Sequence, residues 1–433
     1  MEIRVAVIGP EDLINQVFSL GKSYPEIVMI PVSYSHEQET LEVVQPILDA
    51  VDVLFFTGII PYQITKTSLM TDKPMVFIPP TGTGLYRTLF KIITETTYNP
   101  LHAPLKMSVD TIDKAEVEEC LEELEIIPEK VFLNVDQQAD ALVNFHLKMW
   151  EENSTHVAIT CVKSVYERLK DLGILVYRVI PTKSAIRICL QNVLLEGKAL
   201  LQRNTQIAIG ILHFHNLFAA GQLSEYGIQR RKAALQNLLI DFSEEAQAIF
   251  DWSERDEVRF ITTRGTMERM TQNYKKVPLI NEITMKVEIE TSLGIGFGQT
   301  ANEAEHNAHT ALIKAQSNKP SCFIVDLDGT VVGPVGQNQQ LQYSLRSDDP
   351  IRMQLVKTSG LSVATINKLL SFCESFGTKS ITALDLANGL GVTIRSARRI
   401  LAILERSNLA VIVGEEQPIH RGRPRQLYEI QLA

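Results

Sequence analysis

The stretch ITALDLANGLGVTIRSARRILAILE, residues 381–405, contains two short helical patterns with a glycine-rich turn between them. Thr382 stands where a side chain caps the first helix, and Thr393 stands in the same place before the second. Gly389 and Gly391 are expected to end the first helix, because glycine favours the backbone conformation that follows a helix. The second helix has a predicted buried stripe of apolar residues at helical spacing: Ile394, Ala397, Ile400, Leu401 and Leu404.

The outer face of this second helix is basic. It carries Arg395, Ser396, Arg398 and Arg399, all near the start of the helix. When the N-terminal half of a helix lies in the major groove of DNA, arginine side chains reach guanine edges and phosphates. We therefore predict residues 393–406 as a recognition helix, with Thr393 among its DNA contacts.

A β-hairpin is predicted after the helix, with the basic segment RGRPR, residues 421–425, at its tip. Glycine and proline keep such a tip slim, so that Arg421, Arg423 and Arg425 can enter a minor groove or follow phosphates. Helix, turn, helix and basic hairpin in this order resemble a winged helix-turn-helix. The resemblance implies a DNA-binding domain over residues 361–433. The alternative is a small helical domain with a solvated basic face.

Charge is distributed unevenly along the 433 residues. The net charge is −9, which argues against a general nucleic-acid binder. From Thr393 to Arg425, however, seven arginines and three glutamates leave a surplus of four positive charges. An acidic body with one basic module is typical of a regulator that touches double-stranded DNA with that module.

The compartment is inferred from cysteines and hydropathy. The five cysteines are scattered without CxxC spacing, as expected in a reducing compartment. No apolar run approaches the roughly 18 residues of a membrane span. We therefore expect a cytoplasmic protein with no membrane partner.

Residues 1–197 read as two sets of alternating strands and helices, and the whole chain is expected to combine α/β and α+β domains. Two parallel α/β lobes in one stretch predict a small-molecule sensor with a cleft between the lobes. The layout resembles sensory domains of the periplasmic-binding type and the amino-terminal domain of propionate-catabolism regulators. Residues 184–203 are a helical pattern that we interpret as the connector leaving this sensor.

A small loop between the lobes is a candidate ligand site. It follows an apolar strand, precedes a helix, and contains Thr81, Gly82, Thr83 and Gly84. Hydroxyls, glycine and a helix N-terminus together can bind an anion. The loop lacks the lysine of a P-loop and the spacing of a dinucleotide fingerprint, and the alternative is a plain turn with a helix cap.

The middle of the chain, residues 204–335, has the order strand, long helix, hairpin, helix and then SLGIGFGQTANEAEHNAHTALIKA, residues 292–315. This order resembles the GGDEF and nucleotidyl-cyclase-like fold. The metal-binding aspartate and the glycine pair of that family are both missing, since His213-Phe-His215 and Ser253-Glu-Arg-Asp-Glu257 stand in their places. Two-metal catalysis needs closely placed carboxylates. We therefore predict a degenerate, non-enzymatic domain for sensing or dimerisation, without a metal or cofactor.

Two smaller alternatives remain open in this middle region. His213 and His215 on a strand and His306 and His309 on a helix can make a metal site if their faces meet. The run Thr262-Thr-Arg264 can bind a phosphate or serve a structural purpose.

The segment FIVDLDGT, residues 323–330, matches the DxDGT motif of haloacid-dehalogenase phosphatases. In that resemblance Asp326 is the nucleophile and Asp328 the general acid. The long α/β core that this fold needs does not follow, and Asp-Gly is also the usual turn of a tight hairpin. Residues 333–350 are rich in Gly, Gln and Ser, and the stretch 336–360 is expected to be a linker to the C-terminal domain.

These observations predict a ligand-responsive transcription regulator of the bacterial type. A two-lobed α/β sensor is followed by a degenerate cyclase-like domain and a winged helix-turn-helix. The expected partners are double-stranded DNA, a small-molecule effector and a second copy in a homodimer. The alternatives are a nucleotide-binding or nucleotide-converting enzyme, the phosphatase of Asp326 and Asp328, and a scaffold whose winged helix binds proteins.

Overall fold

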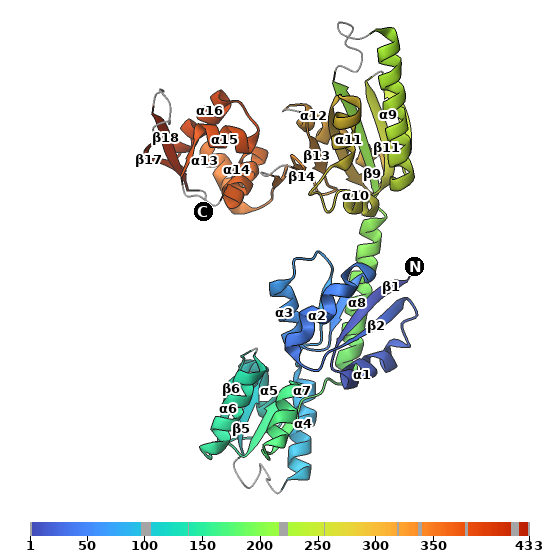
Figure 1. Ribbon diagram of the computed structural model, residues 1–433. Coiled ribbons are helices and arrows are strands. Elements are labelled where there is room, and N and C mark those ends of the chain that lie inside the picture. Colours follow the sequence, from blue (N-terminus) through green and yellow to red (C-terminus); the bar gives the residue numbers. More distant parts are fainter. Residues whose placement is uncertain are drawn as a thin grey trace. The chain divides into compact units, whose positions relative to one another are not determined.

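The structure is a computed structural model that describes residues 2–96, 105–136, 138–215, 224–254, 256–317, 320–336, 340–376, 380–416 and 424–431. The chain divides into two units, Met1–Leu201 and Gln202–Ala433 (Figure 1). Each unit has its own sheets and its own hydrophobic cores, and each is described separately below.

The first lobe of the first unit is a parallel four-stranded sheet in the order β2-β1-β3-β4. Apart from the exposed Arg4 near the start of β1, its central strands β1 and β3 are apolar and buried, as is usual when helices cover both sides of a parallel sheet. The elements of this lobe are β1 (Ile3–Gly9), α1 (Glu11–Gly21), β2 (Ile27–Ser33), α2 (Thr40–Val44), β3 (Val53–Phe56), α3 (Ile59–Ser68) and β4 (Met75–Phe77), with short 3-10 turns at Glu37–Glu39 and Gln45–Ala50.

The second lobe repeats this plan with the strand order β6-β5-β7-β8, again parallel. Its elements are α4 (Gly82–Glu95), β5 (Lys106–Asp110), α5 (Lys114–Glu123), β6 (Lys130–Asn134), α6 (Ala139–Glu151), β7 (Val157–Thr160), α7 (Lys163–Asp171) and β8 (Val176–Arg178). The two predicted α/β lobes are therefore confirmed.

The chain crosses between the lobes twice, once between β4 and α4 and once between β8 and α8 (Lys183–Asn204). Helix α8, predicted as a connector, also belongs to the core of the first lobe. One of its faces packs against β1 through Ile186, Cys189, Leu190 and Val193. Gly197 on the same helix lies so close to Ile3 that an added Cβ would meet the Ile3 side chain at 2.5 Å.

The second unit has a seven-stranded sheet in the order β10-β11-β9-β12-β13-β14-β15. Helices α9 and α11 share a core with one face of this sheet, and α12 packs on the other face (Figure 1). The elements are β9 (Ile207–His215), α9 (Glu225–Ala246), β10 (Ile249–Glu254), β11 (Glu257–Thr263), α10 (Arg264–Met270), α11 (Pro278–Val287), β12 (Glu290–Gly298), α12 (Ala301–Gln316), β13 (Cys322–Val325), β14 (Thr330–Gly333) and β15 (Leu341–Ser344).

The alternating glycines of β12 are explained by the helix that crosses them. A Cβ added at Gly296 would lie 2.1 Å from the backbone nitrogen of Ala308, and Gly294 and Gly298 face α12 in the same way. Glycine on the strand and alanine on the helix therefore bring the two backbones close together. Thr300 caps α12 in a capping box with Glu303.

The alternating stretch 285–291 predicts one strand, but Met285–Val287 are the last turn of α11, so this prediction is wrong at its start. Pro278 at the first turn and the buried stripe of Leu279, Ile283 and Val287 favour the helix. The predicted hairpin around Asp326 and Asp328 is confirmed, since β13 and β14 pair antiparallel and Gly329 has φ +79°.

The C-terminal part contains α13 (Pro350–Ser359), α14 (Val363–Phe376), β16 (Ser380–Thr382), α15 (Ala383–Leu390), α16 (Ile394–Arg406), β17 (Ala410–Glu416) and β18 (Arg425–Ile430). The last three strands form an antiparallel sheet in the order β16-β18-β17. The stretch 336–360, expected as a linker, holds β15 and α13, because Leu341 and Tyr343 are buried in a core shared with α14.

The fold class is thus a mixed α/β multidomain chain with parallel α/β lobes, as expected. Within the described ranges, no helix has the length and the apolar character that crossing a membrane requires.

Candidate functional site

A cleft lies between the two lobes of the first unit, at the carboxyl ends of their parallel strands. Thr57 follows β3, Thr111 follows β5, Cys161 follows β7, and Arg178 ends β8. In open parallel sheets this edge is the usual place for ligands. Two adjoining hollows share Leu13, Thr57, Gly58, Ile59 and Cys161, and have cavity volumes of about 50 and 40 Å³. Such volumes correspond to a few water molecules, and hence to a small ligand.

Polar contacts join the lobes across this cleft. Arg178 Nη1 of the second lobe donates to Asp12 Oδ2 of the first at 2.7 Å, and the Arg178 side chain is only 9% exposed. Ser164 Oγ donates to Glu37 Oε2 at 2.7 Å, and Lys163 Nζ lies 3.9 Å from Asp12 Oδ1. The two lobes therefore meet through pairs of opposite charge and through a hydroxyl–carboxylate bond.

Three polar atoms without accessible surface have no hydrogen-bond partner among the described residues: Thr57 Oγ1 and Arg178 Nε of two lining residues, and Asp12 Oδ1 of a residue that lines neither hollow. The Thr57 residue is 3% exposed, so neither it nor Arg178 is freely hydrated. A buried donor or acceptor without a partner costs about 1–3 kcal/mol. Burial raises the pKa of the neighbouring Tyr34 phenol, and the negative charge of Glu37 adds to this shift.

A fully buried polar cluster of Ser108, Asp110 and His146 lies next to the cleft residues Thr111 and Cys161. His146 Nδ1 lies 2.8 Å from Ser108 Oγ and its Nε2 lies 3.0 Å from Asp110 Oδ2. Asp110 Oδ1 accepts hydrogen bonds from the Cys161 amide at 3.2 Å and from the Thr111 hydroxyl at 2.9 Å. The Asp110 and His146 side chains are 0% exposed, so this serine, histidine and aspartate fix the ends of β5 and β7 rather than catalyse a reaction.

Cys161 lines both hollows, and its thiol is largely protonated at neutral pH. Burial raises the pKa of its thiol to about 12, and the negative charge of Asp110 contributes to the shift. The thiolate, which is the reactive form, is therefore scarce at neutral pH.

The predicted loop Thr81–Gly84 borders the cleft, and its residues have different surroundings. Thr81 and Gly84 line the second hollow. The Gly82 amide at the start of α4 already donates to the carboxylate of Glu116, so that this position is filled by the protein's own anion. Thr83 bonds through its hydroxyl to Thr81 at 2.9 Å and to Thr182 at 3.3 Å, which links the two crossings between the lobes.

The charged residues that join the lobes, Asp12, Glu37, Lys163 and Arg178, were not among the predicted ligand residues. Their partners are more than 120 positions apart in the chain, so spacing alone does not reveal them. A signal is nevertheless present in the sequence. Arg178 is a charged residue at the end of an apolar strand, and Asp12 directly follows the turn after β1.

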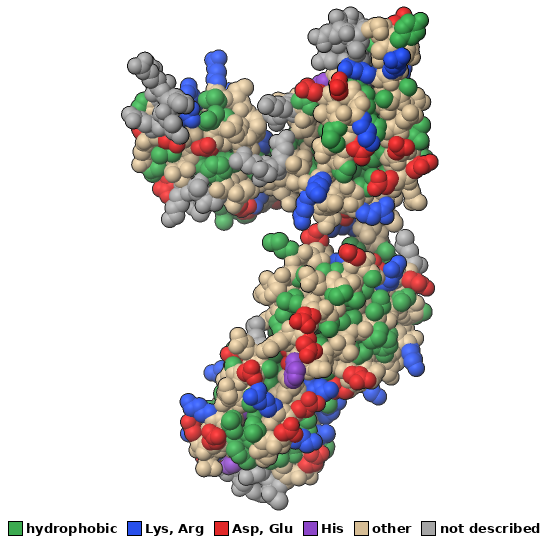
Figure 2. Space-filling model, viewed as in Figure 1, with side chains coloured by type: hydrophobic (Ala, Val, Ile, Leu, Met, Phe, Trp, Pro, Cys, Tyr) green, Lys and Arg blue, Asp and Glu red, His purple; other side chains and the backbone are tan. Residues whose placement is uncertain are grey.

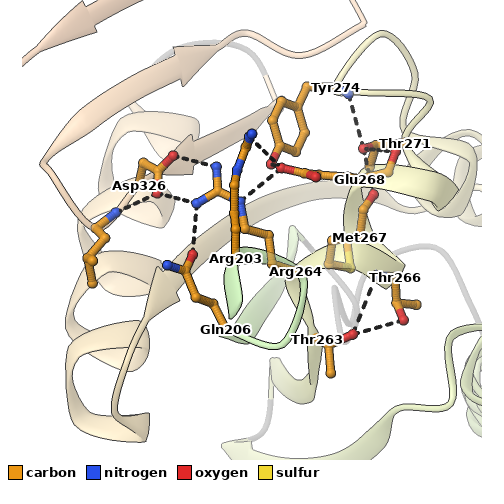
Figure 3. A network of polar contacts seen from close by, with 11 residues as sticks. Arg203, Gln206, Thr263, Arg264, Thr266, Met267, Glu268, Thr271, Tyr274 and Asp326 are labelled. Atoms are coloured by element: carbon orange, nitrogen blue, oxygen red, sulfur yellow. Dashed lines mark hydrogen bonds and ion pairs between the residues drawn. The ribbon is translucent and has the colours of Figure 1, made fainter. Parts of the chain in front are cut away.

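In the second unit, Arg264 lies at the centre of a network of polar contacts (Figure 3). Its Nη1 and Nη2 donate to Asp326 Oδ1 and Oδ2, both at 2.6 Å, and its Nε donates to Glu268 Oε1 at 2.8 Å. Glu268 also accepts from Arg203 and Tyr274, both at 2.8 Å. Burial lowers the pKa of the Arg264 guanidinium, but its hydrogen bonds to Asp326 and Glu268 outweigh burial, and the net shift is upward.

This network bears on two alternatives drawn from the sequence. Arg264 is 6% exposed in its side chain and already holds two carboxylates, so the guanidinium is not free for a phosphate. Both oxygens of Asp326 are hydrogen-bonded to that guanidinium, and Asp328 Oδ1 accepts from the Thr330 amide at 2.8 Å. The DxDGT segment therefore serves as a hairpin turn, with its first aspartate anchored, and does not present a free nucleophile.

The histidines of this unit do not form a metal centre within the described residues, where no group of three or more His, Cys, Asp or Glu side chains could hold an ion. His213 Nδ1 lies 3.3 Å from Glu257, and His215 Nε2 lies 2.8 Å from Ser292 Oγ. Burial, followed by the neighbouring His213, lowers the pKa of His215. His306 and His309 are exposed on α12.

The basic helix predicted from residues 393–406 is α16. Thr393 caps it by accepting from the Ser396 amide at 3.2 Å, and Thr382 caps α15 in a capping box with Asp385. Gly391, with φ +61°, ends α15, whereas Gly389 lies within α15 against the Phe372 ring. The predicted stripe is buried at Ala397, Ile400, Leu401 and Leu404. The prediction that Ile394 belongs to the buried stripe is wrong, because Ile394 begins the helix and is 45% exposed.

The arginines of α16 face solvent. Arg395, Arg398 and Arg399 are exposed, and none of them forms an ion pair with a described residue. Figure 2 shows a basic side chain projecting from the surface over α16. In the predicted wing, Arg425 is exposed at the start of β18, opposite Glu416, whereas Arg421 and Arg423 lie outside the described residues.

Comparisons with known proteins give low similarity. No family model matches the sequence, and no curated protein matches it. An NtrC family transcriptional regulator from Clostridium acetobutylicum is 16% identical, with a TM-score of 0.37, over 46% of this chain and 98% of that one. The transcription regulator CcpA of Lactococcus lactis is 13% identical, with a TM-score of 0.28, over 47% and 92%. The Lac repressor dimer bound to operator and the anti-inducer ONPF is 10% identical, with a TM-score of 0.26, over 46% and 76%. These scores are too low to bear on function.

Proposed function

We propose that this protein is a ligand-responsive transcription regulator that binds double-stranded DNA through residues 361–433. The observation that carries the proposal is the surface of α16. Three exposed arginines, Arg395, Arg398 and Arg399, occur in the first half of a helix whose opposite face is buried, and they are not ion-paired to described residues. Unpaired cations at the N-terminal half of a helix suit contacts with phosphates and with guanine edges.

The order of elements supports a winged helix. Helix α14, strand β16, helices α15 and α16, and strands β17 and β18 follow one another, and the three strands form one antiparallel sheet. In this proposal α16 is the recognition helix, and residues 421–425 between β17 and β18 are the wing. The exposed Arg425 would then follow the DNA backbone beside Arg421 and Arg423.

The two-lobed first unit is proposed as the sensor. Its cleft lies at the carboxyl ends of parallel strands, where ligands usually bind in such sheets, and the charged residues Glu37, Lys163 and Arg178 line it. The sheet of the second unit is proposed as a degenerate cyclase-like domain that mediates dimerisation. Its strand β9 carries His213 and His215, not aspartates, at its end. A homodimer would present two recognition helices to paired half-sites.

The test measures binding of the full chain to a DNA duplex of random sequence by fluorescence anisotropy, at several salt concentrations. We expect the logarithm of the association constant to fall linearly with the logarithm of salt concentration. Replacing one phosphate-contacting arginine should reduce that slope by about 1. The variants are Arg398→Ala and Arg423→Ala, one on α16 and one in the proposed wing.

The matched control is Arg230→Ala, which removes an exposed arginine from α9 of the same unit. It should leave both affinity and slope unchanged. Binding without salt dependence, or binding that Arg398→Ala and Arg423→Ala do not weaken, would remove the DNA proposal. The C-terminal part would then be better regarded as a protein-binding scaffold.

A further inference from the structure

Helix α8 has apolar side chains on two opposite faces. The face that carries Leu190 and Val193 is buried in the core of the first lobe. On the opposite face, Ile188 is 57% exposed and Leu195 is 66% exposed. A helix that covers a core with one face usually presents charged and polar residues on the other. Two large aliphatic side chains, seven positions apart on the outer face, therefore mark a contact surface.

The residues of this outer face follow a regular spacing. Ile188, Asn192, Leu195 and Ala199 succeed one another at intervals of four, three and four residues, and all of them are exposed. These intervals are those of a coiled coil, in which Ile188 and Leu195 take position d and Asn192 and Ala199 take position a. With Gln202 as the next position d, the stripe is about 20 Å long. Such a stripe fits another helix with the same spacing, because the side chains of each helix fill the holes of the other.

Asn192 indicates that the other helix is α8 of a second copy of this chain. Its amide lies on the stripe between Ile188 and Leu195, where a packed helix would remove it from water. An amide has both donors and an acceptor, so the Asn192 amide of a second α8 at the same level satisfies it. Only parallel helices in equal register bring the two amides together. In an antiparallel pair, the register that keeps Ile188 and Leu195 on the stripe would place Asn192 against Leu195 of the other helix.

The flanking charges are compatible with a parallel pair. Beside the stripe, Glu196 would face the uncharged Gln191 of the second copy, so that no like charges meet there. The next contact of this kind would bring Lys198 towards Arg203. Each of these cations already contacts a carboxylate of its own chain, at 3.4 Å for Lys198 and at 2.8 Å for Arg203. Their like charges are therefore compensated within each copy.

We infer that α8 pairs with α8 of a second copy as a parallel two-stranded coiled coil over residues 188–202. Ile188 and Leu195 each pack against the same residue of the second copy, and the two Asn192 amides hydrogen-bond to each other. This inference rests on the proposed function, since it gives the proposed homodimer a surface in α8 besides the sheet of the second unit. A two-fold axis along the pair would bring like ends of the two helices together, as paired half-sites require.

The first measurement is the dimer dissociation constant of the full chain, by analytical ultracentrifugation. Leu195→Glu should raise this constant at least about tenfold, because two leucines leave an apolar seam and two like charges replace them. Asn192→Leu should lower it, because a polar residue at position a reduces the stability of a coiled coil. The matched control is Leu172→Glu, which changes a leucine that is 53% exposed elsewhere in the first unit and should leave the constant unchanged. Circular dichroism checks that each variant is folded.

The second measurement is disulfide cross-linking of full-length cysteine variants under mild oxidation. Ile188→Cys and Leu195→Cys should each link two chains, because equal positions d face each other in a parallel pair. Leu172→Cys is the control, and the unchanged chain gives the background from its five native cysteines. In the antiparallel register neither position would face itself, so neither variant would link.

The inference is overturned if the unchanged chain is a monomer, if Leu195→Glu dissociates no more readily than Leu172→Glu, or if Asn192→Leu weakens the dimer. It is also overturned unless both cysteine variants cross-link above the background. DNA binding is measured on the same preparations. A chain that binds DNA with the expected salt dependence but fails these tests would remove this surface alone, whereas a dimer that passes them without binding DNA would remove the proposed function.

Discussion

The ion pair between Arg264 and Asp326 gives a sharp prediction, because it separates a structural role of the DxDGT segment from a catalytic one. The perturbation is Asp326→Ala. It removes two hydrogen bonds of 2.6 Å from a guanidinium that is 6% exposed. Removing one partner of a buried ion pair typically costs 3–5 kcal/mol, and we expect about 3 kcal/mol here, because Glu268 and Gln206 still contact Arg264.

A double-mutant cycle isolates the pair. Arg264→Met alone should also be strongly destabilising, since it leaves Asp326 without its cation, although Glu268 keeps its bonds to Arg203 and Tyr274. The double variant should cost less than the sum of the single ones, with a coupling of about 2 kcal/mol. The control is Asp328→Ala on the same turn. This exposed carboxylate accepts from one backbone amide, and its loss should cost about 1 kcal/mol or less.

The assay is urea denaturation of the full chain followed by tryptophan fluorescence. The sequence has two tryptophans, Trp150 in the first unit and Trp252 in the second, so a Trp150→Phe background reports on the second unit. A loss of less than about 0.5 kcal/mol in Asp326→Ala would refute the structural role. Hydrolysis of a generic phosphoester by the unchanged chain, abolished in Asp326→Ala, would restore the phosphatase alternative.

Three further changes probe the packing of the second unit. Gly296→Ala should lower the free energy of unfolding of the second unit by about 3 kcal/mol in urea denaturation, because the new Cβ meets the backbone of α12 at 2.1 Å. The control Gly414→Ala should be nearly neutral, because the nearest atom to its new Cβ lies at 3.9 Å. Thr382→Ala should cost about 1 kcal/mol through loss of the α15 cap, measured in the same way. Burial lowers the pKa of Lys368 from 10.5 to about 8, and the positive charge of nearby Lys314 contributes to this shift. Between pH 8 and pH 10.5 the unfolded chain therefore holds this proton more often than the folded chain does. Because the unfolded state binds more protons, the contribution of Lys368 to folding stability rises with pH across this range. Between pH 7.5 and pH 10, the melting temperature of the unchanged protein should therefore rise relative to that of Lys368→Met. If the two proteins show parallel changes of melting temperature with pH, Lys368 is not the cause.

Local features of the fold were predictable from sequence because their causes are local. Thr382, Thr393 and Thr300 are helix caps, as their positions before apolar helical repeats indicate. The stripe on α16 and the strands of both lobes follow from spacing in the same way. The strand prediction is wrong at Met285–Val287 because three alternating residues fit a strand and the end of a helix equally well. Pro278 and the helical spacing of Leu279, Ile283 and Val287 are the signals that distinguish the helix.

The cleft was predictable in outline but not in its residues. Two α/β lobes imply a ligand edge at the carboxyl ends of their strands, and this edge is where the hollows lie. The pair Asp12–Arg178, however, joins residues 166 positions apart, and Arg264–Asp326 joins residues 62 apart. Such pairs depend on how elements pack in space, and a single sequence carries no record of that packing.

Helix α8 contributes side chains to each unit of the chain. Its first turns supply Ile186, Cys189 and Val193 to the core of the first lobe. In the second unit, Arg203 near the end of α8 bonds to Glu268, and Gln206, just beyond it, bonds to Arg264. Asp326 connects this Arg264 network to the β13–β14 hairpin, which shares a core with α14, α15 and α16. Within the second unit, the Arg264–Asp326 pair therefore joins the end of α8 to the core that holds the proposed DNA-binding helices.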